Sequence, residues 1–144
     1  MDVVIGNSAQ IIKQAQQIRY AVFVQEQLIP QELDLDGLDQ ESMHLLVTDD
    51  STPVATARLS FSSASSAILA RVAVLKAFRG AGVAKAVIQK AIDYAIKQRV
   101  HHIDIHAHQH LRGYYENFGF KYVDTCEVVG GHPLIAMSYR TDVQ

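Results

Sequence analysis

The feature that most constrains this chain is a strand, a glycine-containing turn and a helix in direct succession. An apolar run at residues 72–75 leads through Arg79-Gly80-Ala81-Gly82-Val83-Ala84 into a helical pattern that continues to about Lys97. Such a turn points backbone N–H groups and the positive end of a helix dipole at whatever lies above it. A phosphate or pyrophosphate is the natural ligand for that position.

The glycines of this turn favour the close approach of a ligand. Gly82 has no side chain that would block phosphate oxygens, and Gly80 can adopt a positive φ. Lys76, Arg79 and Lys85 add positive charge nearby. The turn is not a Walker loop, because no Gly-Lys-Ser/Thr follows, and its glycine spacing is not that of a dinucleotide fingerprint. Spacing alone leaves two interpretations open, a phosphate-binding turn and a plain strand-to-helix corner.

The whole chain, residues 1–144, predicts a single α+β domain. A strand at about residues 102–107 follows the helix, and a strand–helix–strand unit implies a parallel pair with a right-handed crossover. The predicted strands are residues 2–5, 44–48, 54–61, 67–75, 102–107, 120–129 and 134–140. The predicted helices run from a cap at Asn7 to about Val24, from about 84 to 97, and from about 112 to 118. We therefore expect a mixed, mostly antiparallel sheet of about seven strands with one parallel pair, flanked by helices.

Composition narrows the class of protein. With 49% hydrophobic and 19% charged residues, the 144-residue chain can bury a core of its own. A formal net charge of −2 argues against general nucleic-acid binding, which needs a basic surface. The single cysteine, Cys126, excludes an intramolecular disulfide, and its place in a late strand predicts a small packed residue. Because no signal peptide and no membrane-length apolar run is present, we expect a cytoplasmic protein without membrane contact.

Several motifs in a fixed order indicate a family. The turn resembles motif A of the GNAT (N-acetyltransferase) superfamily, Arg/Gln-x-x-Gly-x-Gly/Ala after an apolar strand, with Arg79, Gly82 and Ala84 in the defined positions. Residues 114–120, Tyr-Tyr-Glu-Asn-Phe-Gly-Phe, resemble motif B of the same superfamily. The stretches that resemble its ElaA-like, or YjcF-like, branch are residues 18–27, 56–59 and 71–74. Because the resemblance spans nearly the whole chain, it is specific.

The resemblance implies the GNAT fold, acetyl-coenzyme A as the cofactor and a primary amine as the acceptor. In the family, backbone N–H groups of the turn hold the pyrophosphate, which here implicates Arg79, Gly80, Ala81, Gly82, Val83 and Ala84. The preceding strand, here Val72, Ala73 and Val74, pairs with the pantetheine arm, and a bulge splays it from the strand at 103–107. A backbone N–H near Val74 is then expected to stabilise the oxyanion formed when the amine attacks the thioester directly.

Motif B supplies the expected general acid. Tyr115 resembles the family's tyrosine beside the coenzyme sulfur, where a phenol can protonate the departing thiolate. A core tyrosine with a satisfied hydroxyl is the structural alternative. Asn117, on the same short helix, is expected to touch the coenzyme.

Histidines are the candidates for the general base. Some members of the family carry a glutamate in the strand that corresponds to residues 67–75, and this chain has none there. His106 and His108, at the end of the following strand, are therefore the expected bases, since imidazole titrates near neutral pH. His106-x-His108-x-His110 has metal-ligand spacing if all three lie on one strand, but the strand is expected to end near Ala107, so we predict no metal site. His44 is a further residue expected to line the pocket.

The acidic residues have several interpretations. Residues 28–42 predict a solvated loop or a mobile segment over a site. A pair between Arg19 and Glu26 is expected to brace the substrate wall, and Glu26 with the acids of residues 32–41 can alternatively attract a cationic amine. We expect the loops at 28–42 and 130–133 to build the acceptor pocket.

The sequence thus predicts an acetyl-CoA-dependent N-acetyltransferase that acts on a small-molecule or protein amine, and a homodimer is compatible with it. Two alternatives stay open. One is a coenzyme A-binding sensor or partner module with little turnover, favoured by the absent strand glutamate. The other is a metal-dependent enzyme built on the histidines.

Overall fold

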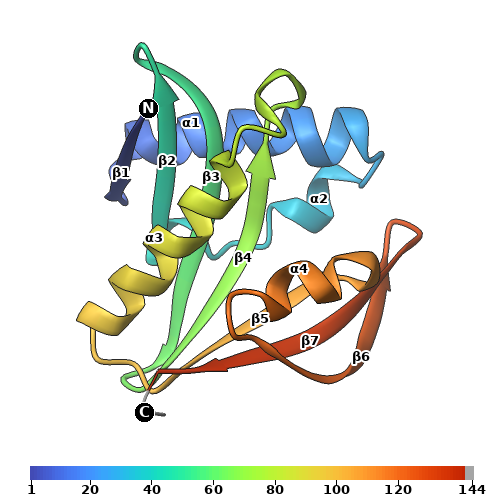
Figure 1. Ribbon diagram of the computed structural model, residues 1–144. Helices are drawn as coiled ribbons and strands as arrows, with labels where there is room; N and C mark the ends of the chain where they lie inside the picture. Colours follow the sequence, from blue (N-terminus) through green and yellow to red (C-terminus); the bar gives the residue numbers. More distant parts are fainter. Residues whose placement is uncertain (142–144) are drawn as a thin grey trace.

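Seven strands form one mixed sheet in the computed structural model, which describes residues 1–141 (Figure 1). They are β1 (Asp2–Gly6), β2 (Met43–Asp49), β3 (Thr52–Ser63), β4 (Ser66–Val74), β5 (His102–His108), β6 (Lys121–Val129) and β7 (His132–Arg140). Their order across the sheet is β1-β2-β3-β4-β5-β7-β6, and β4–β5 is the parallel pair. The predicted α+β class, with a mixed and mostly antiparallel sheet, is confirmed.

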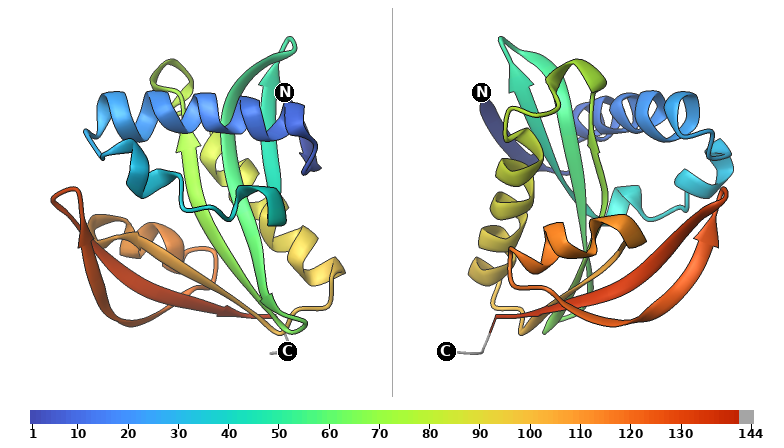
Figure 2. Two further views of the ribbon diagram at one scale, coloured as in Figure 1. Left: turned by 180° about the vertical axis from the view of Figure 1, so that it is seen from behind. Right: turned by 45° about the vertical axis from the view of Figure 1, so that its right-hand side comes forward.

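Helices cover both faces of the sheet. They are α1 (Ala9–Arg19), a π-helix (Tyr20–Glu26), α2 (Gln31–Asp34), α3 (Val83–Lys97) and α4 (Arg112–Glu116), with 3-10 turns at Asp39–Glu41, Lys76–Phe78 and Gln109–Leu111. Figure 2 shows α1 and α2 on one face and α3 on the other. The apolar stripe of α3 packs on the sheet to form the main core, and the same core contains Tyr115 and Phe120.

The first helix differs from the expectation at both ends. Ser8, not Asn7, is its N-cap, because the Ser8 hydroxyl accepts a hydrogen bond from the Ile11 N–H at 3.2 Å. The helical run also passes its predicted end near Val24, because a π-helical stretch extends it to Glu26. This extension carries the end of the helical run toward the turn between β4 and α3, as the ion pair described below shows.

The two parallel strands pair over their first halves and then part. Their register runs from Ser66 opposite His102 to Leu69 opposite Ile105. Beyond these residues β4 and β5 diverge, so that the sheet opens toward the carboxyl ends of both strands (Figure 1). The predicted strand–helix–strand unit therefore forms, and its two strands are splayed.

A bulge in β4 lies where the strands part. Between β3 and β4 the register passes from Arg58 opposite Ala70 to Thr56 opposite Ala73, so three steps on β4 match two on β3. Arg71 occupies the bulge with a φ of 55°, in the left-handed region that most side chains avoid. Because a bulge bends its strand and increases the local twist, it accounts for the separation of β4 from β5.

Candidate active site

The turn between β4 and α3 has the open backbone that the sequence predicted. Gly80 and Gly82 have φ angles of 87° and 77°, and Gly82 is the residue that precedes the helix. A Cβ atom at either glycine would find no protein atom within 4 Å. The space above the turn is therefore free for a ligand, and the first N–H groups of α3 point toward it.

Arg79 joins this turn to the end of the π-helix. Its Nε donates a hydrogen bond to the Val74 carbonyl at 3.0 Å, and its Nη2 donates to Glu26 Oε1 at 2.7 Å. The hydrogen bond and charge of each partner lower the pKa of Glu26 and raise the pKa of Arg79. The expected pair between Arg19 and Glu26 is wrong, because Glu26 binds Arg79 while Arg19 is fully buried elsewhere.

The last residues of β4 border the opening in the sheet. Val72, Ala73 and Val74 follow the bulge, and Ala73 and Val74 pair with β3 on one side. Within residues 1–141, the parallel pairing to β5 ends before them, which leaves their other edge toward the opening. This edge is where an extended chain of a ligand can add backbone hydrogen bonds.

Tyr115 reaches the same core from α4. Its side chain is 7% exposed, and the rings of Tyr114 and Phe120 lie with centroids 5.5 and 5.9 Å from its own. Burial raises the pKa of Tyr115 well above its usual value. Tyr115 and Val74 belong to the same core cluster. Asn117 is exposed just after α4.

The histidines separate into two groups. The His108 ring lies 5.6 Å from that of His110 and 5.1 Å from that of His132, and these three line a shallow pocket with Gln109 and Pro133. Burial is the main cause that lowers the pKa of His108. His106 lies apart from this group, with its Nδ1 3.7 Å from Glu127. The three-histidine metal motif therefore does not converge on one point.

His132 is a member of this pocket that the sequence analysis did not single out. Its Nε2 lies 3.2 Å from the Gln27 carbonyl, which ties the start of β7 to the end of the first helical run. Nearby, a Cβ at Gly130 would lie 3.1 Å from a side-chain carbon of Ile29. The segments at 28–42 and 130–133 thus meet, but this proximity depends on strand pairing and has no local sequence signal.

Most of the acidic segment is exposed, as expected of a solvated loop, but arginines hold three of its aspartates. Asp34 and Asp39 are buried. Three arginines and three aspartates alternate in a closed ring, in the order Arg19, Asp34, Arg71, Asp36, Arg58 and Asp39. Each contact in the ring measures 2.7–3.1 Å. Because the six charges cancel, these aspartates do not offer the free negative charge that would attract a cationic amine.

Burial and charge act in opposite directions on this ring. Burial alone would raise the pKa of Asp39, but hydrogen bonds from Arg19 and Gln16 hold it far below its usual value. His44 packs beside the ring with no exposed surface, and its Nε2 lies 2.8 Å from the Asp39 carbonyl. His44 therefore supports the ring and does not line the pocket, contrary to expectation. Burial lowers its pKa.

The predicted burial of Cys126 is also wrong. The sequence predicted a small packed residue, whereas the thiol is exposed on β6. This strand is at the edge of the sheet, and all but one of its residues are exposed. Hydrophobicity alone does not indicate which strand occupies an edge.

Comparison with known proteins assigns the class. The family described as "Acetyltransferase (GNAT) domain" matches residues 9–141, and this chain therefore belongs to the GNAT acetyltransferase family. Membership supports acyltransferase activity. Among the described residues, no helix is both long and apolar enough to cross a membrane.

The relatives include members of the predicted branch. YjcF of Bacillus subtilis (strain 168), described as an uncharacterized N-acetyltransferase, is 38% identical over 95 residues, which span 66% of either chain. ElaA of Escherichia coli (strain K12) is 32% identical over 130 residues, or 85% of this chain and 82% of ElaA. The crystal structure of Escherichia coli ElaA matches with a TM-score of 0.86 at 28% identity, covering 96% of this chain and 99% of that one.

A more distant structure shares the fold. An aminoglycoside 6'-N-acetyltransferase complexed with coenzyme A matches with a TM-score of 0.78 at 12% identity, covering 100% of this chain and 99% of that one. At this identity the likeness is one of fold alone. It shows that a protein with this fold binds coenzyme A.

Proposed function

We propose that this protein transfers the acetyl group of acetyl-coenzyme A to a primary amine. The observation that carries the proposal is the opening between β4 and β5 beside a glycine turn with room for a ligand. A pyrophosphate at the N–H groups of residues 79–84 and a pantetheine arm along Val72, Ala73 and Val74 would place the thioester in that opening. A cytoplasmic location fits this use of the coenzyme and belongs to the same proposal.

The chemistry assigned to the opening is direct attack of the amine on the thioester carbonyl. A backbone N–H near Val74 donates to the oxyanion of the tetrahedral intermediate. The bond from the carbonyl carbon to sulfur then breaks, and Tyr115 protonates the departing thiolate. Asn117, exposed after α4, is assigned to contact with the coenzyme.

The amine must lose a proton, and His108 is the residue we assign to accept it. It stands at the end of β5, half-buried in a pocket that it shares with His132 and Pro133. His106, the other candidate from the sequence, lies outside this pocket and beside Glu127. His108 is thus the better placed of the two.

A coenzyme A-binding module with little turnover is the second candidate, because β4 carries no glutamate. Two measurements separate the candidates. Acetyl-CoA and CoA should each raise the thermal midpoint, since a ligand at 100 times its Kd adds about 2.7 kcal/mol to the free energy of unfolding. Release of the CoA thiol in a screen of amines supports the transferase, and stabilisation without any thiol release supports the module. No stabilisation by either coenzyme rejects both.

Gly82→Glu tests the turn itself. The carboxylate would enter the space above the turn and repel a pyrophosphate, so we expect coenzyme-dependent stabilisation to disappear. Gly37→Glu is the matched control, because Gly37 also has a positive φ of 84° and open surroundings but belongs to the connection after α2 and not to the turn before α3. It imposes a similar backbone strain and should keep the stabilisation. Retained coenzyme affinity in Gly82→Glu would refute the assignment of the turn.

A further inference from the structure

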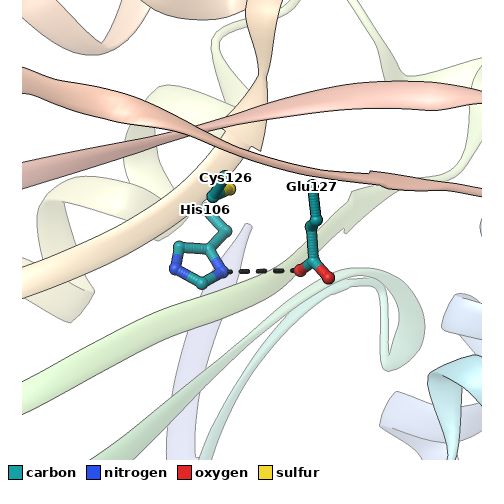
Figure 3. Close-up of side chains that lie close together, drawn as sticks. All are labelled: His106, Cys126 and Glu127. Atoms are coloured by element: carbon teal, nitrogen blue, oxygen red, sulfur yellow. Dashed lines mark ion pairs between the residues drawn. The ribbon is translucent and has the colours of Figure 1, made fainter.

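Three side chains with metal-binding atoms gather on β5 and β6 (Figure 3). An imidazole nitrogen of His106, the sulfur of Cys126 and a carboxylate oxygen of Glu127 all lie within 4.8 Å of one another. His106 and Glu127 point toward each other, with 3.7 Å between Nδ1 and Oε1. All three residues are exposed, so a hydrated ion can reach them.

A bulge in β6 explains how the consecutive residues Cys126 and Glu127 can both face the same site. Neighbours in a regular strand point to opposite faces of the sheet. Between β6 and β7 the register passes from Thr125 opposite Ile135 to Glu127 opposite Leu134, so two steps on β6 match one on β7. Cys126 is the extra residue. The bulge frees it from the alternation and lets its thiol lie on the side of Glu127.

A small residue on β7 leaves room between the histidine and its two partners. His106 stands opposite Ala136 of β7, and Ala136 stands opposite Asp124 of β6. Directly opposed residues share a face of the sheet, so Ala136 is on the side of the imidazole. Its single methyl group allows the imidazole to extend across β7 toward β6.

The donor set matches zinc. Thiolate, imidazole and carboxylate all bind Zn²⁺, at metal–ligand distances of about 2.0–2.3 Å. A tetrahedron with such bonds has donor separations of roughly 3.3–3.8 Å, so the atoms need to close by about 1 Å, which exposed side chains achieve by rotation. One thiolate and one carboxylate balance the two charges of the ion while the imidazole stays neutral. We propose that His106, Cys126 and Glu127 bind a zinc ion.

Three protein ligands leave one coordination position for water or another ligand. The bound ion links β5 to β6 across β7, on the part of the sheet beyond the opening. The site uses neither the coenzyme turn nor Tyr115, and its test does not depend on acetyl transfer.

Cobalt titration of the full chain tests the site, because the sequence contains one cysteine. Co²⁺ takes the ligands that zinc takes, and a near-ultraviolet thiolate-to-cobalt band arises when a cysteine sulfur coordinates it. One equivalent of Co²⁺ should produce this band, and Zn²⁺ should remove it by displacement. Absence of the band at millimolar Co²⁺ overturns the proposal.

Variants assign the ligands. Cys126→Ser should abolish the band. His106→Asn and Glu127→Gln should each weaken Co²⁺ binding at least about tenfold, because even the loss of a residue that only hydrogen-bonds to a metal ligand lowers metal affinity by that factor. His102→Asn is the matched control, because His102 is on the same strand and 3.6 Å from the carboxylate of Asp104 but outside the cluster. It should leave the band and the affinity unchanged. Unchanged affinity in His106→Asn, or an equal loss in His102→Asn, overturns the assignment.

Alkylation of the thiol gives a second measurement. Zn²⁺ should slow the alkylation of Cys126 in the wild-type chain and not in His106→Asn, because a coordinated thiolate is shielded from the reagent. Equal alkylation rates of the wild-type chain with and without Zn²⁺ contradict a site that includes the cysteine.

Discussion

The burial of Tyr115 bears on its proposed role as the general acid. Its ring belongs to the main core, with Tyr114 and Phe120 in edge contact. A tyrosine hydroxyl is protonated throughout the physiological range, and burial raises the pKa of Tyr115 further above that range. Protonated phenol is the form that can give a proton to a leaving thiolate. The same burial holds the ring in one place, which suits a group that acts at one fixed atom.

Tyr115→Phe should separate binding from turnover. Removal of the hydroxyl keeps the ring in the core, so the Kd for coenzyme A should change by less than about twofold while kcat falls roughly 100-fold or more. Steady-state thiol release and calorimetric titration measure the two effects. Tyr114→Phe is the control, because Tyr114 is adjacent and more exposed. An unchanged kcat in Tyr115→Phe removes this residue as the acid.

At the residue scale, the sequence predicts what depends on local chemistry. Gly80 adopts the positive φ that its position in the turn suggests, and Gly82 adopts one as well. Cys126, His132 and His44 are different, because their surroundings are set by strands far away in the chain. The order and register of the strands decide whether such a residue is packed, faces a pocket or supports an ion pair. The residue's neighbours in sequence do not encode that order.

The acidic segment shows the same limit at the scale of an element. A run of acids normally indicates a solvated loop. Here the balancing arginines come from three other elements, Arg19 from α1, Arg58 from β3 and Arg71 from the bulge in β4. The left-handed backbone of Arg71 is therefore part of both features, because it opens the sheet and anchors residues 34 and 36. No spacing in the sequence indicates that these arginines meet.

Most of the elements themselves follow from periodicity. All seven strands lie within a few residues of their predicted places, because alternating and apolar runs are bounded by turn residues. The extension of the first helix to Glu26 was not predicted, since a π-helix uses the same residues as an α-helix and differs in hydrogen bonding. This extension brings Glu26 to Arg79.

Glu26→Gln should tighten coenzyme binding. In the structure the Arg79 guanidinium donates hydrogen bonds to the Glu26 carboxylate. A pyrophosphate bound in the turn would compete with this carboxylate for the same donors. Both side chains are more than one-third exposed, and exposed ion pairs contribute little free energy. Removal of the pair should therefore lower the Kd for coenzyme A only roughly two- to fivefold. Calorimetry measures the Kd. Arg79→Gln is the counterpart and should raise it. A weaker affinity in Glu26→Gln would mean that the carboxylate positions Arg79 for the ligand.

For the whole molecule, the unit β4–α3–β5 determines the order of the central strands and contains the opening in the sheet. Its parallel strands β4 and β5 lie between the antiparallel strands β1, β2 and β3 on one side and the β7–β6 hairpin on the other. The right-handed crossover through α3 follows from chain chirality, so the order of the central strands is predictable. The ring of ion pairs, which fastens residues 34–39 to α1, β3 and β4, is not predictable from the sequence, and it affects the stability of the entire domain.

The ring and His44 together predict that stability falls as the pH is lowered. Burial lowers the pKa of His44 and outweighs the hydrogen bond and charge of Asp39, which act to raise it. The unfolded chain therefore binds a proton below about pH 6.5 that the folded chain resists, and stability begins to fall there. Asp36 and Asp39 also have lowered pKa values, despite a burial effect that opposes the shift. Their unfolded carboxyls protonate near pH 3.9, so a second loss follows below about pH 4–5.

Urea unfolding between about pH 7 and pH 3 measures both steps, and two variants assign them. His44→Gln keeps a donor for the Asp39 carbonyl but cannot be protonated, so the decline just below pH 6.5 should flatten. Asp39→Asn leaves two buried arginines short of a partner and should cost about 3–5 kcal/mol at pH 7. In that variant the loss below pH 4 should shrink, because the carboxyl that gives most of it is gone. A wild-type free energy of unfolding that is constant from pH 7 to pH 4 contradicts the role given to His44.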